Sequence, residues 1–261
     1  MTAKDDIGKI QERESKFWDR QIDSFAKDEK DLMVNEYNLN VLESFVFERL
    51  GDLKDKKVLD CGCGSGVLST VLAKRGATVF SFDISHESIN MTKKRAEANG
   101  VGNLVTPQVM SFEDLIYKDQ YFDFAVGYFV LHHIDIDKGA RELNRVLKKG
   151  GRAIFLENSS NNPFLTIARK FLTGRFGIPK HGSEDETPLS CKKIRQIGEV
   201  FSGDKKIYYK NFFFFRLIDE FIFKEKIKMI TKLLKILDEV CYRVLPMLRK
   251  FGYLQIVEFN K

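Results

Sequence analysis

Two kinds of hydrophobic spacing divide the chain, and the change between them occurs near residue 56. In residues 9–50 apolar side chains such as Phe17, Trp18 and Ile22 recur every three or four positions, which predicts helices. From residue 56 short apolar runs alternate with amphipathic stretches. This alternation predicts βαβ units, in which parallel strands form a sheet covered by helices on both faces.

The predicted elements follow from these runs and from the glycines after them. Five strands are expected at residues 57–60, 78–82, 104–109, 122–127 and 153–157. Helices are expected at residues 67–75, 87–99 and 138–147, and a glycine follows each within three residues. Later in the chain, residues 158–190 predict loops, 192–201 and 216–249 helices, and 207–214 and 253–259 strands.

The predicted fold class is α/β, with a Rossmann-like, doubly wound and mostly parallel sheet of seven strands. Residues 1–50 form an N-terminal helical segment in this prediction, and residues 51–261 form the main domain. That domain is expected to contain a substrate-facing insertion at residues 158–190 and a basic amphipathic helical insertion at 216–251, before the last strand. In such sheets ligands bind at the carboxyl ends of the strands.

The most informative pattern is an acid, three alternating glycines and a second acid. Asp60 ends an apolar run, Gly62, Gly64 and Gly66 follow it, and Asp83 ends the next predicted strand. Glycine permits positive φ and close approach of the backbone to a ligand. The free N–H groups of the next helix suit a carboxylate or phosphate, and an acid at the second strand end can accept bonds from ribose hydroxyls.

A dinucleotide site is the nearest alternative, and the spacing disfavours it. The fingerprint G-x-G-x-x-G requires a third glycine where this chain has Val67, counting from Gly62, or Ser69, counting from Gly64. A pyrophosphate would also be repelled by Asp60, whereas a cationic ligand would be attracted.

Residues 56–157 resemble class I S-adenosylmethionine-dependent methyltransferases, in the broad group that includes ubiquinone and menaquinone biosynthesis enzymes. The matching segments are VLDCGCGSG at 58–66, FDIS at 82–85, FEDL at 112–115, FDFAVGYFVLHHI at 122–134 and ELNRVLKKGG at 142–151. The resemblance implies the fold and S-adenosylmethionine as the cofactor, with no metal.

The same resemblance implies a role for each residue along the cofactor. Asp60 and the glycine loop, including Gly62, Gly64 and Gly66, would lie against its methionine part, and Asp83 would hold the ribose. Ile84, Phe112 and Glu113 would surround the adenine, and Gly127 and Tyr128 would line the methyl-transfer centre. Ser111 stands where relatives often carry an acid, and Ile84 and Phe112 have packing in the core as an alternative.

His132 and His133 follow the fourth predicted strand, near the expected methyl group. An imidazole there could remove a proton from a hydroxyl acceptor, since histidine titrates near neutrality. His133 is the preferred catalytic base of the two, and capping or packing is the alternative for either. Cys61 and Cys63 are expected to fill small positions in the glycine turn rather than bind metal.

The distribution of charge adds a second feature at the C-terminal end. Residues 203–261 carry thirteen lysines and arginines against seven acids, so this stretch accounts for the whole net charge of +6. A basic amphipathic helix in 216–251 could contact an anionic membrane surface, and ordinary packing on the sheet is the alternative. Arg169, Arg175 and His181 are candidates for contacting a polar acceptor.

The expected function is methyl transfer to an oxygen or carbon of a small, lipophilic acceptor. Nucleic-acid methylation is disfavoured, because residues 127–133 read GYFVLHH instead of an Asn-Pro-Pro-Tyr type of motif. A non-catalytic, cofactor-binding adaptor at the membrane is the third hypothesis. The chain shows no signal-like start, no long apolar run and only four cysteines, which favours the cytoplasm. A peripheral position at the inner face of the membrane is the alternative that the basic C-terminal stretch adds. No pattern predicts an oligomeric state.

Overall fold

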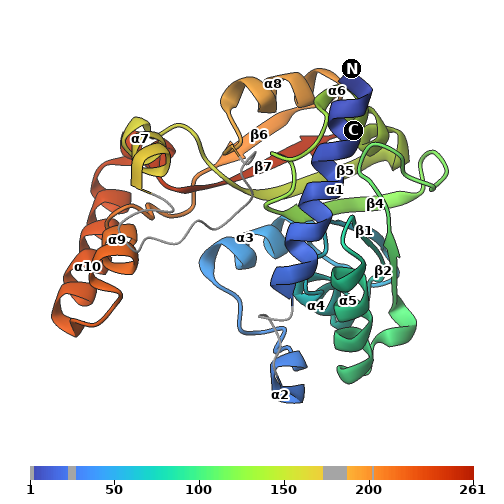
Figure 1. The fold of residues 1–261 in the computed structure, drawn as a ribbon, viewed down its shortest axis with the longest axis horizontal. Helices are drawn as coiled ribbons and strands as arrows, with labels where there is room; N and C mark the ends of the chain where they lie inside the picture. The colour runs from blue at the N-terminus through green and yellow to red at the C-terminus, as the bar shows by residue number, and fades with distance from the viewer. Residues whose placement is uncertain (1–2, 23–27, 173–186, 202) are drawn as a thin grey trace.

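The computed structural model describes residues 3–22, 28–172, 187–201 and 203–261 (Figure 1). Seven strands form one sheet in the order β3-β2-β1-β4-β5-β7-β6. They are β1 (Lys57–Cys61), β2 (Thr78–Asp83), β3 (Val105–Val109), β4 (Phe122–Tyr128), β5 (Leu147–Asn158), β6 (Lys205–Tyr208) and β7 (Leu254–Asn260). Strands β1 to β5 pair in parallel, and β7 runs antiparallel between β5 and β6. The predicted Rossmann-like, mostly parallel sheet is confirmed.

Helices cover both faces of this sheet. They are α1 (Ala3–Gln21), α2 (Glu29–Leu32), α3 (Val41–Leu50), α4 (Val67–Lys74), α5 (His86–Ala98), α6 (Ile136–Val146), α7 (Pro163–Leu172), α8 (Cys191–Glu199), α9 (Phe215–Ile218) and α10 (Lys228–Val244), with the shorter turns η2 (Gly102–Leu104), η3 (Asp219–Phe223) and η4 (Pro246–Phe251).

Side-chain alternation along the central strands divides the core into two layers. Leu59 of β1 and Ala125 of β4 pack with α6 and α8, whereas Val58 and Val126 pack with α3 and α4. Both strands are buried on both faces, which is typical of a parallel sheet under helices. The carboxyl ends of β1, β2 and β4 therefore lie at the same edge of a sheet that is packed on both faces.

The predicted N-terminal helices are present, and a non-helical connection precedes α3. Residues 33–40 are not helical and separate α2 from α3. The side chain of Asn99 binds this connection, because its Oδ1 accepts the N–H of Val34 and its Nδ2 donates to the Leu32 carbonyl. These polar contacts replace the bonds that a continuous helix would have made.

Two predictions after residue 158 are also corrected. The predicted loop region contains α7, and the predicted strand at 207–214 ends at Tyr208. The buried carboxylate of Asp238 accepts the backbone N–H groups of Phe214 and Phe215, and that of Arg216. This cap starts α9 and turns the aromatic run away from the sheet.

The predicted helix at 216–249 is divided into α9, η3, α10 and η4. Lys224 and Glu225 both have positive φ, which ends the first helical piece, and Pro246 follows the end of α10. These elements and α7 form a lobe that extends from the sheet (Figure 1). Among the described residues, no helix combines the length and apolarity needed to cross a membrane.

Candidate active site

The glycine loop joins the ends of β1 and β2. The N–H of Cys63 donates to the Phe82 carbonyl at 3.0 Å, which ties the loop to the neighbouring strand. The Asp83 carboxylate accepts the N–H of Gly64 through one oxygen and that of Ser85 through the other, both at 3.0 Å. Asp83 therefore fixes the loop and keeps further acceptor capacity on each oxygen.

The three glycines of the loop have different reasons to be glycine. All have positive φ, between 49° and 78°. A Cβ on Gly62 would lie 2.8 Å from Cγ2 of Val130, and one on Gly66 would lie 2.6 Å from Cα of Thr92. Gly64 has open space around its Cβ position instead. Gly66 thus permits helix packing, and Gly64 leaves room for a ligand.

Asp60 provides a buried carboxyl group at the base of the loop. Its Oδ2 accepts the Ser69 hydroxyl at 2.5 Å, and Ser69 also bonds to Ser81 at 2.7 Å. Burial raises the pKa of Asp60 to about 7, and the nearby charge of Asp83 acts in the same direction. Burial also raises the pKa of Asp83. Two closely placed acids at the strand ends suit a ligand that carries positive charge.

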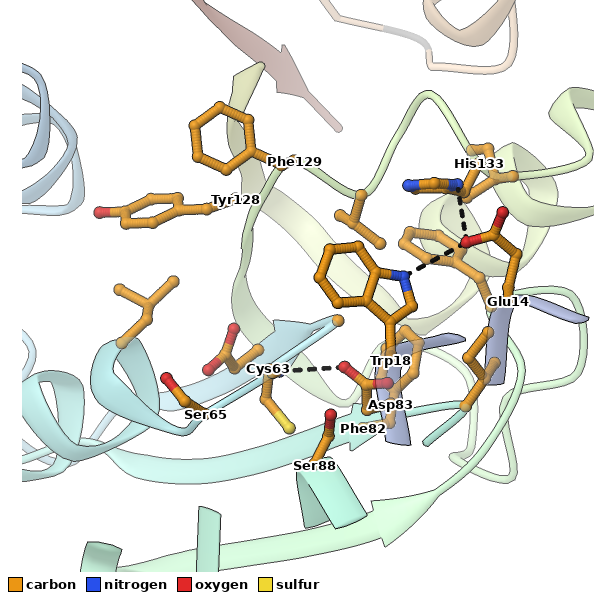
Figure 2. A pocket seen from close by; sticks show the side chains of 18 of the residues that line it. Glu14, Trp18, Cys63, Ser65, Phe82, Asp83, Ser88, Tyr128, Phe129 and His133 are labelled. Atoms are coloured by element: carbon orange, nitrogen blue, oxygen red, sulfur yellow. Dashed lines mark hydrogen bonds and ion pairs between the residues drawn. The ribbon is translucent and has the colours of Figure 1, made fainter. Parts of the chain in front are cut away.

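A cavity of about 370 Å³ lies above this loop (Figure 2). Of the predicted site residues, those that line it are Asp60, Gly62, Gly64, Asp83, Ile84, Phe112, Glu113, Tyr128 and His133. The predicted residues Gly66, Gly127 and His132 do not line it. Glycine is required at position 127 by the close packing of the sheet, because a Cβ there would lie 2.6 Å from the Cys61 carbonyl oxygen.

Helix α1 forms one wall of the cavity and supplies residues that sequence reasoning missed. Gln11, Glu14 and Trp18 line the cavity at helical spacing. Gln11 donates to Glu113 at 2.8 Å, and the Ser15 hydroxyl donates to the Ile84 carbonyl at 3.0 Å. The sequence contains one indication of this wall: Glu14 is an acid on the apolar face of an amphipathic helix, where a buried or functional role is expected.

The adenine-side residues predicted from the resemblance lie together at the cavity wall. Phe112 is buried and packs edge-on against Phe82. It therefore belongs to the hydrophobic core and also lines the cavity. Glu113 bonds to Gln11, to the Ser111 hydroxyl and to the N–H of Asp135. Gln11 also donates to Ser111, so the α1 side chain reaches the position where relatives often have an acid.

The two histidines have different surroundings. His132 is buried, and its Nδ1 lies 2.7 Å from Oε2 of Glu157. His133 faces the cavity, with its Nδ1 3.7 Å from Oε2 of Glu14. The same Glu14 oxygen accepts the indole N–H of Trp18 at 3.2 Å, so Glu14 lies between the two rings (Figure 2). This arrangement could move a proton near a bound ligand.

The cysteines of the glycine loop and the candidate acceptor-contacting residues can also be located in part. Cys61 and Cys63 are buried free thiols, and the described residues contain no cluster of three or more His, Cys, Asp or Glu suited to a metal ion. The Arg169 guanidinium lies 4.7 Å from the ring centre of Tyr253. Arg175 and His181 lie outside the described residues.

Comparison with known proteins gives consistent matches. A family model described as a methyltransferase domain matches residues 59–155. The chain is 27% identical over 158 residues to a ubiquinone biosynthesis O-methyltransferase of Acinetobacter baylyi, covering 60% of this chain and 63% of the relative. It is 36% identical over 175 residues to a ubiquinone/menaquinone biosynthesis C-methyltransferase of Bartonella bacilliformis, covering 60% and 66%. The chain thus spans slightly less than two thirds of these curated relatives.

The fold comparison covers nearly the whole chain. A geranyl diphosphate C-methyltransferase from Streptomyces coelicolor, solved with geranyl diphosphate and S-adenosyl-L-homocysteine, aligns with a TM-score of 0.58 and 15% identity. The alignment covers 96% of this chain and 97% of that one, which shows a shared fold. Residues 59–155 thus match a methyltransferase domain, and the chain shares the fold of a geranyl diphosphate C-methyltransferase, in agreement with the resemblance to class I S-adenosylmethionine-dependent methyltransferases.

Proposed function

We propose that this chain transfers a methyl group from S-adenosylmethionine to an oxygen or carbon of a small lipophilic acceptor. One observation carries the proposal: a single, mainly apolar cavity contains Asp60 and Asp83 at its base and the His133–Glu14 pair at its wall. A cofactor site and a group able to accept a proton therefore share one water-poor space.

The residues at the base of the cavity fit S-adenosylmethionine. The cofactor's amino group and sulfonium are cationic, and Asp60 supplies a carboxyl group beside the loop. Asp83 keeps a free acceptor position on each oxygen for two ribose hydroxyls. Ile84 and Phe112 offer apolar surfaces to an adenine, and Gly64 leaves open space at the loop.

The wall of the cavity suits the transfer step. S-adenosylmethionine supplies an activated methyl group on sulfur, and positioning and desolvation account for most of the acceleration of its transfer. His133 would accept the proton of a hydroxyl acceptor, and the Glu14 carboxylate would stabilise the resulting imidazolium. Tyr128, which lines the cavity, would lie beside the transfer centre. The described surroundings give the buried Tyr128 hydroxyl no hydrogen-bond partner, and it could bond to a ligand.

A lipophilic acceptor is supported by the lining and by the relatives. Trp18, Phe129 and Val130 line the cavity beyond the glycine loop and offer no charge. The relatives are named for ubiquinone biosynthesis, and the S. coelicolor structure contains geranyl diphosphate, which has an apolar chain. Apolar walls favour such chains over charged acceptors.

Two measurements test the proposal in sequence. Calorimetric titration with S-adenosylhomocysteine should show saturable binding, which Asp83→Ala should weaken by at least about tenfold through loss of the ribose contacts. Incubation with methyl-labelled S-adenosylmethionine should then label a component of a lipid extract in preference to an aqueous extract. A folded protein that fails to bind the cofactor, or that labels only RNA or water-soluble compounds, would contradict the proposal.

A further inference from the structure

Helix α10 exposes an apolar stripe along its outer side. The stripe consists of Met229, Leu233, Ile236, Val240 and Val244, each more than a third exposed, with Met229 80% exposed. The spacing of three or four residues places all five on one face. The opposite face carries Leu234 and the buried Asp238, and α10 packs against α9, η3 and η4. The stripe is therefore the side of α10 that the described residues leave exposed, whereas the inner side of the helix is packed.

Two other elements of the lobe also expose apolar side chains. Helix α7 exposes Phe164, Ile167 and Phe171 on one face, and η4 exposes Met247, at 84%. Asn162 at the start of α7 donates to the Phe251 carbonyl at the end of η4, so the two elements are held together. Figure 1 shows α7 and α10 in the same lobe, away from the sheet. Exposed apolar residues gathered in this way mark an interaction surface.

Positive charge borders the stripe. Residues 224–250 contain eight lysines and arginines against three acids, a net charge of +5. Lys228, Lys232, Lys235 and Arg243 of α10 are all exposed. At 100° per residue Lys232 and Arg243 border the stripe, and Lys228 and Lys235 lie farther round on the same side of the helix. Glu239 lies among these cations and pairs with Arg243 at 2.6 Å, so among the described residues the three lysines carry the unpaired positive charge of this side. Asp238 is engaged with Arg216, which removes one of the three acids from the outer surface.

We infer that this lobe docks on an anionic phospholipid surface, with the α10 stripe in the interfacial layer and the bordering lysines on the headgroups. A helix with an apolar face and a cationic border binds such surfaces through buried area and charge together. A second copy of this chain is the weaker candidate, because a symmetric contact would bring two positively charged borders together. The inference goes beyond methyl transfer and does not depend on the cofactor.

Vesicle cosedimentation tests the inference without any cofactor. The wild-type protein should bind vesicles made of equal parts phosphatidylcholine and phosphatidylglycerol, should bind phosphatidylcholine alone much less, and should be released by salt. Leu233→Glu with Val240→Glu should weaken binding by at least about tenfold, because charge enters the interfacial face. Replacing Lys232 and Lys235 with Gln should weaken it by about fivefold for each lysine.

A charge-matched control separates the lobe from the rest of the surface. Tyr37→Glu with Ile116→Glu places the same charges on exposed apolar positions elsewhere and should leave vesicle binding unchanged. Unchanged calorimetric binding of S-adenosylhomocysteine would show that every variant is folded. Equal binding by the lobe and control variants, or no wild-type binding to anionic vesicles, overturns the inference. A lipid-free dimer that the lobe variant dissociates also overturns it, in favour of a second copy.

Discussion

Nδ1 of His132 lies 2.7 Å from Oε2 of Glu157, and both side chains are buried near the carboxyl ends of β4 and β5. The other Glu157 oxygen accepts the N–H groups of Val130 and Leu131 at 2.8 and 2.7 Å. One carboxylate thus binds three consecutive residues of the segment that follows β4. Because residues 130–132 are held in this way, the next residue, His133, is placed in the cavity wall. His132 therefore helps to position His133.

Glu157→Ala should therefore destabilise the protein strongly. It leaves two backbone N–H groups and one imidazole buried without their acceptor, and each such group costs about 1–3 kcal/mol. We expect the free energy of unfolding in urea to fall by about 3 kcal/mol or more. Glu157→Gln retains an acceptor oxygen and should lose about 1 kcal/mol. The exposed Glu48→Ala serves as a control, and an equal, small effect of both alanine variants would refute the anchoring role.

The sequence predicted the sheet and the base of the site because both depend on local patterns. Asp60 and Asp83 end apolar runs, and parallel strands bring such ends to one edge whatever the rest of the fold does. The glycine loop was recognisable for the same reason. Positive φ at Gly62 and Gly64 is a local requirement that leaves a visible mark in the sequence.

Apart from the acid at Glu14 on the apolar face of α1, the wall of the site depends on contacts that no local pattern encodes. The His132–Glu157 pair requires the pairing of β4 with β5, and Glu14 reaches His133 from a helix far away in the chain. The predicted strand at 207–214 is wrong beyond Tyr208 for a related reason. The aromatic run before Arg216 reads as a strand, and only the cap from the distant Asp238 turns it into a helix start.

Trp18 should report cofactor binding directly. It is the only tryptophan in the sequence, and it lines the cavity with its indole N–H bonded to Glu14. Saturation with S-adenosylhomocysteine should change the intensity or wavelength of tryptophan emission, with the same midpoint as calorimetry. Trp18→Phe should remove the signal and retain most of the binding heat. Calorimetric binding with no change in wild-type emission would show that α1 does not wall the cofactor site.

His133→Ala should reduce turnover far more than cofactor binding. General bases contribute about 10²–10⁴-fold to rate, and a loss of this size is expected with a hydroxyl acceptor. Glu14→Gln should cause a smaller loss, because it removes the carboxylate that stabilises the charged imidazole. Single-turnover assays with the labelled lipid fraction would measure both. Exposed His86→Ala is the matched control, and unchanged turnover in His133→Ala would exclude the base.

Asp60 should make cofactor binding depend on pH around neutrality. Its pKa is raised to about 7 by burial, so the free protein loses the negative charge of this group as the pH falls below that value. Affinity for S-adenosylhomocysteine, whose amino group stays cationic in this range, should fall about fivefold between about pH 7 and about pH 6. Asp60→Asn should bind more weakly and lose this dependence. An identical pH profile in the two proteins would contradict the assignment.

The same carboxyl group should have the opposite effect on the stability of the cofactor-free protein. The folded pKa of Asp60, about 7, lies above its ordinary value of 3.8, so the unfolded chain releases the proton first as the pH rises. Its contribution to stability is therefore complete below about pH 4 and is lost progressively up to about pH 7. Asp60→Asn has no such group, and its Oδ1 can still accept the Ser69 hydroxyl. The free energy of unfolding of the variant, relative to wild type, should rise across this range by up to roughly 4 kcal/mol. Urea unfolding at both ends of the range measures the difference, and a difference that stays constant would show that Asp60 remains ionised in the folded protein.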